Sequence, residues 1–247
     1  MIPLPLRDDT PTYRAPVVTV IIIVVNALVW LFEFFTQQPC GSHSRALFMP
    51  AVYDYGAIPA WVVHGLNEGQ VLIGECRAVA TLHQEVPARL TVLTSMFLHG
   101  SWLHIIGNMW FLWIFGDNIE DAMGRVRYVI FYLLCGVIAA GTQILVTPDS
   151  VVPMVGASGA IAGVLGGYAL LYPRASVRCL WILIIFITTI DLPAWLLLGL
   201  WFVSQFFVSP HSGVAAWAHV GGFVAGFGLV RLFVKARPVR PQRVVWQ

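Results

Sequence analysis

Charged residues are scarce in this sequence. Asp, Glu, Lys and Arg together make up 11% of the 247 residues, whereas soluble globular domains average about 25%. Hydrophobic residues make up 58%, including 10 Trp and 15 Phe. So little charge excludes an ordinary soluble domain and indicates an integral membrane protein.

Other missing patterns exclude further classes of protein. The formal net charge is only +2, and no basic stripe is interleaved with aromatic residues, so we expect no nucleic-acid partner. None of the four cysteines belongs to a C-x-x-C motif, and H-E-x-x-H is absent. Neither a zinc site nor a thioredoxin-like site is therefore predicted, and we expect no metal and no cofactor.

Long apolar segments are what the sequence does contain, and six of them are predicted to cross the membrane at about 20 residues per span. They cover residues 16–35, 101–115, 128–146, 158–172, 192–207 and 217–233. This pattern predicts an all-α membrane protein. Its transmembrane domain covers residues 16–234, between a poorly ordered tail (1–15) and a basic tail (235–247). Residues 37–94 are too long for a plain connector, so we expect a long structured loop between spans one and two.

Two regions leave alternatives open. Cys40 and Cys76 share the first loop, where they form either a disulfide, if the compartment is oxidising, or two unpaired thiols. Residues 179–190 are apolar but precede a break, because Asp191 is expected to cap the fifth span with Pro193 in its first turn. We expect this segment to lie at the interface or to be partly re-entrant. The sequence Gly116-Asp117-Asn118 is predicted to form the turn that ends span two.

The distribution of Lys and Arg predicts the orientation. Basic residues precede span one, follow span six, and lie between spans two and three and between spans four and five, whereas residues 147–155 and 209–216 contain none. By the positive-inside rule, both termini are cytoplasmic. We therefore expect a multi-pass protein of the plasma (inner) membrane. Its fourth and sixth spans begin near the extracytoplasmic side, where an active site would open.

Ser158 stands at the head of the fourth span. Gly159, Gly163 and Gly167 recur at four-residue spacing, which by itself favours close helix packing as the reason for small residues here. The sequence is not a Gly-x-Ser-x-Gly elbow, because residue 160 is Ala. However, this span of about 15 residues reaches only about 22 Å, less than the hydrocarbon core of about 30 Å. Ser158 should therefore lie below the membrane surface, beside free N–H groups suited to an oxyanion.

His219 stands near the start of span six and has two interpretations. It is either a buried histidine bonded to a backbone carbonyl or the base for a serine nucleophile, and its small neighbours Ala218, Gly221 and Gly222 allow another helix to come close. Span six offers no acid, so the base would act in a Ser–His dyad.

His104 and Asn108 are four residues apart and share one face of span two. They suit either an oxyanion hole or interhelical hydrogen bonds. A metal site that includes His99 is disfavoured, because no intramembrane acid lies beside it.

Three motifs, in this order and at this spacing, resemble the rhomboid intramembrane serine proteases. They are HGSWLHIIGN from residue 99, GASG from residue 156 and AHVGG from residue 218, and the resemblance covers residues 89–226. It implies a six-helix rhomboid-like bundle in which the first loop is a membrane-embedded lateral loop. It also implies roles for individual residues: Ser158 as nucleophile, His219 as general base and acid, His104, Asn108 and the Ser158 N–H as the oxyanion hole, and His99, Gly156, Gly159 and Gly222 as structural or supporting residues.

One departure concerns the histidine. Some family members carry an aromatic residue, packed on the histidine, where this sequence has Ala162, so support for His219 must come from elsewhere. The resemblance implies cleavage of transmembrane protein substrates in the lipid bilayer. A catalytically inactive rhomboid-like factor that binds and delivers membrane proteins is the alternative. A transporter or channel is disfavoured, because Glu33 and Asp191, the acids near spans, lie towards span ends.

Overall fold

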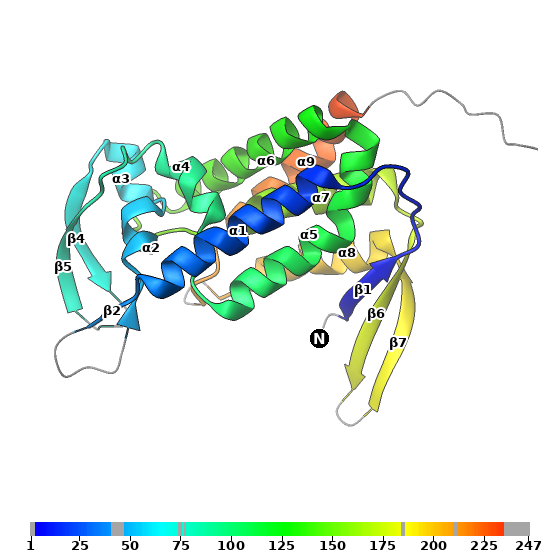
Figure 1. Ribbon diagram of the computed structural model, residues 1–247, viewed down its shortest axis with the longest axis horizontal. Coiled ribbons are helices and arrows are strands. Elements are labelled where there is room, and N and C mark those ends of the chain that lie inside the picture. Colours follow the sequence, from blue (N-terminus) through cyan, green and yellow to red (C-terminus); the bar gives the residue numbers. More distant parts are fainter. Residues whose placement is uncertain are drawn as a thin grey trace, which may run out of the picture.

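Six helices of 11 to 22 residues form a bundle, with small antiparallel sheets at its two ends. The computed structural model describes residues 3–40, 47–73, 76, 78–183, 186–209 and 212–234. The bundle helices are α1 (Val17–Phe35), α5 (Trp102–Met123), α6 (Arg125–Val146), α7 (Ser158–Leu171), α8 (Ala194–Ser204) and α9 (Ala216–Phe233). They lie side by side along the long axis of the molecule (Figure 1). The predicted basic tail, residues 235–247, lies outside the described residues.

The remaining elements are short. The other helices are α2 (Pro50–Tyr55), α3 (Pro59–His64), α4 (Thr91–Thr94) and the 3-10 turns η1 (Ser95–Phe97) and η2 (Gln205–Phe207). The strands are β1 (Leu4–Asp8), β2 (Gln38–Pro39), β3 (Leu47–Phe48), β4 (Glu68–Ile73), β5 (Ala78–His83), β6 (Ser176–Leu183) and β7 (Phe186–Pro193). The fold is thus mostly helical, but the prediction of an all-α protein is wrong.

Within the described residues, α1, α6 and α9 are long and apolar enough to cross a membrane. The shorter helices α7 and α8, the latter continued by η2, are also apolar, and α5 has the length of a span but carries acidic residues. Each of the six predicted spans overlaps one of these helices. Membrane crossing by all six remains a prediction.

Helix α5 differs most from its predicted span. The turn expected at Gly116 is wrong, because the helix continues to Met123 and ends at Gly124. Glu120, in the last turn of α5, is buried. Its carboxylate accepts hydrogen bonds from the first turn of α1: from Val18 N at 3.0 Å, Thr19 N at 2.8 Å and Thr19 Oγ1 at 2.9 Å. A carboxylate satisfies the free N–H groups of a helix start and complements its dipole. Glu120 of α5 is thus a cap for the start of α1.

Helices α7 and α9 pack with their backbones almost in contact. A Cβ added at Gly222 would lie 2.0 Å from the carbonyl oxygen of Gly159, and one at Gly226 would lie 1.8 Å from that of Gly163. Only glycine allows two helices to approach this closely. Every residue of α7 from Gly159 to Tyr168 is buried, so α7 lies in the centre of the bundle.

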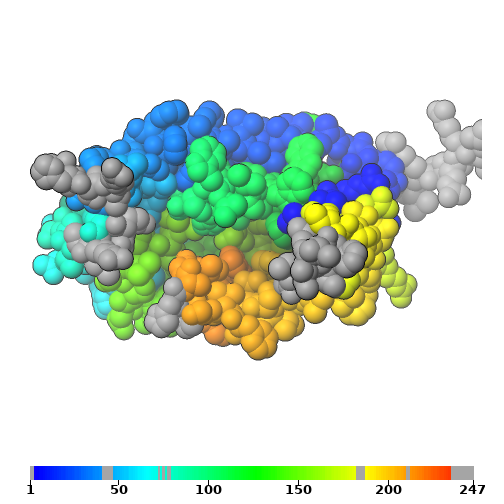
Figure 2. Space-filling view, turned by 90° about the horizontal axis from the view of Figure 1, so that it is seen from below, coloured from blue at the N-terminus to red at the C-terminus, as the bar shows by residue number. Residues whose placement is uncertain are grey.

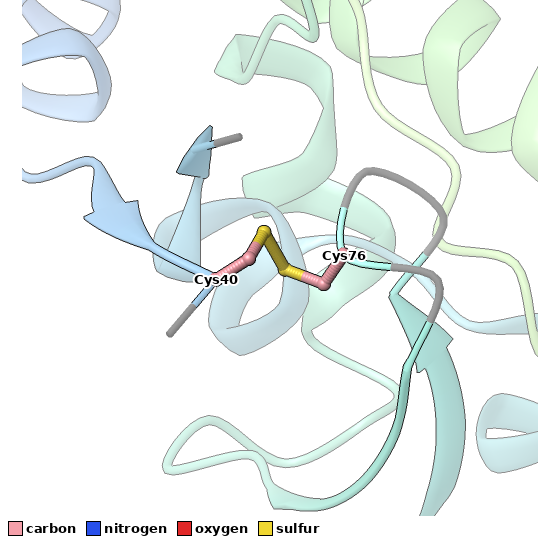
Figure 3. The surroundings of a disulfide bond; sticks show 2 residues. All are labelled: Cys40 and Cys76. Carbon is pink, nitrogen blue, oxygen red and sulfur yellow. A yellow bond between two sulfur atoms is a disulfide. The ribbon is translucent and has the colours of Figure 1, made fainter. Parts of the chain in front are cut away.

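The segment between α1 and α5 has its own small core and a disulfide. Buried side chains from α2, α3 and β4 form this core, with Ile58, Trp61 and Val71 almost fully covered. Cys40 and Cys76 are bonded (Figure 3), so of the two alternatives for these cysteines the structure has the disulfide. The segment is also joined to the chain before α7, where Ala57 and Met154 exchange two backbone hydrogen bonds.

A three-stranded sheet at the opposite end accounts for two segments that the sequence left without regular structure. β6 and β7 form a hairpin, and β1, from the N-terminal tail, pairs with β6 (Figure 1). The predicted poorly ordered tail is therefore partly a strand, and the apolar segment 179–190 belongs to the hairpin.

Asp191 does not cap α8, as the sequence had suggested. It pairs with Arg178 across the hairpin at 2.9 and 3.1 Å, and these hydrogen bonds lower the pKa of its carboxyl group. The residue that precedes α8 is Pro193 instead. This acid therefore belongs to a sheet and not to a span.

Candidate functional site

Ser158 is the first residue of α7 and is partly exposed. The loop before it is held by the Ala57–Met154 pair and by a hydrogen bond from Gly156 N to Ser95 O of 2.8 Å. Gly156 has φ +124°, a conformation that L residues rarely adopt. The loop thus turns sharply into α7, whose first N–H groups, that of Ser158 among them, have no partner inside the helix.

His219 meets Ser158 from α9. The His219 Nε2 to Ser158 Oγ distance is 2.8 Å, and the close packing of α7 on α9 at Gly159 and Gly222 brings the two residues together. The N-terminus of α9 is held by Gln143 of α6, whose Oε1 accepts from Trp217 N and Ala218 N at 3.1 and 3.3 Å. A neutral imidazole at this distance can take the hydroxyl proton.

The other edge of the His219 ring is held by two residues that the sequence analysis missed. Nδ1 lies 2.8 Å from Gln205 Oε1, and the Trp201 ring packs on the imidazole with centroids 5.8 Å apart. Both belong to the α8–η2 segment and lie four residues apart. Together they provide the support that Ala162 cannot give. The sequence offered one sign of this support, which is that Gln205 is a single amide side chain in an apolar segment.

His104 and Asn108 of α5 point at the loop in front of Ser158. A Cβ on Gly156 would lie 2.6 Å from His104 Nε2 and 3.6 Å from Asn108 Nδ2, so both nitrogens face Gly156. The α5 helix begins here because Ser101 Oγ caps it, accepting from His104 N at 3.2 Å. The structure therefore brings both predicted donors to Gly156, two residues before Ser158.

The hydrogen-bond partners of His104 and His99 indicate what each ring nitrogen does. Gly100 N donates to His104 Nδ1 at 3.4 Å, so in the neutral ring Nε2 carries the proton and is a donor. Asn108 Nδ2 donates to His99 Nε2 at 3.0 Å, and His99 N is bonded to the Glu33 carboxylate at 3.1 Å. His99 is fully buried and lies behind Asn108, in a position that orients the amide.

A metal site finds no geometric support in the part of the chain that the structure describes. No group of three or more His, Cys, Asp or Glu side chains there could hold an ion. His99 and His104 lie with their ring centroids 5.0 Å apart. His99 Nε2 and His104 Nδ1 are both occupied by hydrogen bonds from N–H groups.

Comparison with known proteins adds the family. The model of the Rhomboid domain matches residues 87–236, more than half of the chain, and this stretch contains Ser158, His219, His104 and Asn108. The chain is 39% identical to Rhomboid-like protein 11, chloroplastic, of Arabidopsis thaliana over 82 residues, 33% of this chain and 29% of that protein.

Two similar proteins are named as proteases. Rhomboid-like protease 3 of Toxoplasma gondii is 29% identical over 150 residues, 58% of this chain and 51% of that protein. Rhomboid protease GluP of Bacillus subtilis (strain 168) is 32% identical over 136 residues, 55% of this chain and 24% of that protein. The chain spans about half or less of the length of these relatives. By its sequence and by the match of the domain model, the chain belongs to the rhomboid family.

Proposed function

We propose that the protein is a serine endopeptidase that cleaves transmembrane segments of membrane proteins, with Ser158 and His219 as a catalytic dyad. The observation that carries this proposal is the 2.8 Å hydrogen bond between Ser158 Oγ and His219 Nε2 at the start of α7. Membership of the rhomboid family, which includes named proteases, supports it.

The residues around the pair have the chemistry that acyl transfer requires. In the proposed first step, Ser158 Oγ attacks the scissile carbonyl carbon while His219 Nε2 takes the hydroxyl proton. The carbonyl oxygen becomes an oxyanion, which accepts hydrogen bonds from His104 Nε2–H, Asn108 Nδ2–H and the Ser158 N–H. The imidazolium then protonates the leaving nitrogen as the C–N bond breaks. Water, activated by His219, hydrolyses the resulting ester and releases Ser158.

The proposed placement in the membrane follows from helix length. We take all six bundle helices as membrane elements. Helix α7 has 14 residues and spans about 21 Å, so it cannot cross a hydrocarbon core of about 30 Å. Ser158 then lies below the surface. Figure 2 shows one face of the bundle, where the green atoms of α5 and the orange atoms of the C-terminal helices border a strip of more distant atoms.

Two features at opposite ends of the bundle support the proposed orientation. Arg125, Arg174 and Arg178 lie at the end that carries β6, which the positive-inside rule assigns to the cytoplasm together with both termini. The Cys40–Cys76 disulfide joins the residue after β2 to the turn between β4 and β5, and these strands lie at the other end (Figure 1), as expected if that end faces an oxidising compartment. We propose the plasma (inner) membrane as the site. Several relatives are named as mitochondrial or chloroplastic, which makes an organelle membrane the competing location.

The test combines covalent labelling with cleavage. Purified protein in detergent and in liposomes is treated with a fluorophosphonate probe and, separately, with a model transmembrane substrate. We expect the wild type to label and to cleave, and both Ser158→Ala and His219→Ala to lose both activities. Ser176→Ala, at the other end of the bundle, and His83→Ala, in the first loop, are the matched controls and should behave as wild type.

Two outcomes would contradict the proposal. Cleavage by Ser158→Ala at the wild-type rate would exclude Ser158 as nucleophile. A folded wild type that neither labels nor cleaves any transmembrane substrate, but binds one, would favour the inactive binding and delivery factor instead.

A further inference from the structure

Gln205 is a buried amide in an otherwise apolar element. It is the first residue of η2 and is 8% exposed, and Ser204 is its only polar neighbour between Ala194 and Phe207. A buried amide must find hydrogen-bond partners to offset the cost of leaving water. Its partners therefore indicate what it does.

The hydrogen bonds fix which way the amide points. Gln205 Nε2 donates to Trp201 O at 3.0 Å and to Ser204 Oγ at 3.2 Å. The hydroxyl proton of Ser204 is already donated to Trp201 O at 2.6 Å, so both partners of Nε2 act as acceptors. The reversed amide would place Oε1 against these two acceptors. The network thus requires Oε1, and not Nε2, to face His219.

This orientation determines the tautomer of His219. Oε1 only accepts, so His219 Nδ1, 2.8 Å away, must donate and carry the ring proton. A neutral imidazole has one ring proton, and Nε2 then presents its lone pair to Ser158 Oγ. The opposite tautomer would set a lone pair against Oε1 and an N–H against the hydroxyl oxygen. It could not take the serine proton.

We propose that Gln205 is a positioning residue, the third member of a hydrogen-bonded chain with His219 and Ser158. It holds His219 in the Nδ1–H tautomer, fixes the ring plane together with Trp201, and strengthens its hydrogen bond when the ring becomes an imidazolium. A neutral amide does this without the desolvation cost of burying a carboxylate. The role rests on the proposed proteolytic function, because it concerns the protonation of the same base.

The predicted effect is kinetic. Gln205→Met keeps the length of the side chain and removes the acceptor. We expect kcat to fall about 10- to 100-fold, the rate equivalent of one hydrogen bond to a charged group. KM should be unchanged, because Gln205 does not touch the substrate side of the dyad. The rate of fluorophosphonate labelling should fall in proportion. Gln70→Met, exposed on β4, is the matched control.

Gln205→Glu separates positioning from packing. The carboxylate restores an acceptor for Nδ1–H. Its second oxygen faces Trp201 O and Ser204 Oγ and can accept only when the Ser204 hydroxyl turns toward it, so we expect part of the lost kcat to return. It should also move the acidic limb of the pH–rate profile to higher pH, because a negative charge stabilises the imidazolium. A role in packing alone predicts neither the rescue nor this shift.

The decisive measurement needs no variant of Gln205. Isotope-labelled histidine in the wild type, assigned by comparison with His219→Gln, reports the tautomer of His219 by NMR. An Nδ1–H tautomer supports the proposal, and an Nε2–H tautomer overturns it. A kcat for Gln205→Met within twofold of wild type also overturns it. Either result leaves the proposed proteolytic function standing. Labelling of Ser158→Ala by the fluorophosphonate probe at the wild-type rate would refute the proteolytic function, and with it the role of Gln205.

Discussion

Replacing Gly222 with alanine tests whether the close approach of α7 and α9 sets the geometry of the Ser158–His219 pair. The added Cβ would lie 2.0 Å from the carbonyl oxygen of Gly159, whereas ordinary contact begins at 3.4 Å. That oxygen belongs to backbone in a fully packed helix and cannot rotate away. The two helices must therefore separate locally by more than about 1 Å, since packed interiors leave no room for such a change.

The expected loss follows from where the separation occurs. Gly159 follows Ser158 directly, and Gly222 lies one helical turn after His219. An opening of this size takes the 2.8 Å contact between Ser158 Oγ and His219 Nε2 beyond hydrogen-bond distance. A misplacement of about 1 Å can cost about 100-fold in rate, and we expect kcat to fall by that factor. Over-packing should also lower the free energy of unfolding by about 1–3 kcal/mol.

A second glycine in the same helix provides the control. A Cβ on Gly228 would meet no atom within 4 Å, so Gly228→Ala should cleave and unfold like the wild type. Cleavage of a model transmembrane substrate gives kcat for both variants, and thermal unfolding in detergent gives their stabilities. If Gly222→Ala is folded and cleaves within twofold of Gly228→Ala, helix separation does not control the dyad and the reasoning is refuted.

Three further predictions concern other parts of the protein. Glu120→Gln leaves one acceptor for the three donors of the α1 start and should lower the unfolding free energy by about 1–3 kcal/mol. An unchanged melting temperature would exclude the capping role. Reduction of the Cys40–Cys76 disulfide should cost about 2–4 kcal/mol, measured by unfolding with and without reductant. Limited proteolysis of the reduced protein should cut first between α1 and α5. Equal protease resistance of the reduced and the disulfide-bonded protein would count against this. Asn108→Ala and His104→Ala should each reduce kcat by about 10²–10³ with little change in KM, and a loss confined to KM would assign these residues to substrate binding.

Local patterns in the sequence were sufficient to place the six bundle helices approximately and to select Ser158, His219, His104 and Asn108 as candidate site residues. Helix α7 begins at Ser158, and α9 contains His219 near its start, both as expected, because apolar runs and their interruptions report helix ends directly. The grouping of His104 and Asn108 followed from their four-residue spacing. Each of these inferences uses residues close together in the chain.

The features that were missed depend on partners far along the chain. The length of α5 was missed because Glu120, which lies beyond the predicted end of span two, has its hydrogen-bond donors in α1, about 100 residues earlier. Gln205 gave only the signal of a polar residue in an apolar segment, and its role depends on where α9 places His219. The β6–β7 hairpin is apolar along much of its length, so no alternation of polar and apolar residues marked it as a pair of strands.

The sheet formed by β1 also has a consequence for the order in which the molecule assembles. β1 is made first, yet its neighbour β6 follows α7 in the chain, and Asp9 accepts from Ser176 N across 167 residues. During synthesis the N-terminal segment must therefore wait until four bundle helices have been made before it can pair. After β6 has been made, and until β1 pairs with it, the edge of β6 lacks its partner, and a free strand edge invites pairing with other chains. A protein fused to the N-terminus should delay the pairing of β1 with β6, so its effect should be seen in the yield of assembled protein before it is seen in catalysis.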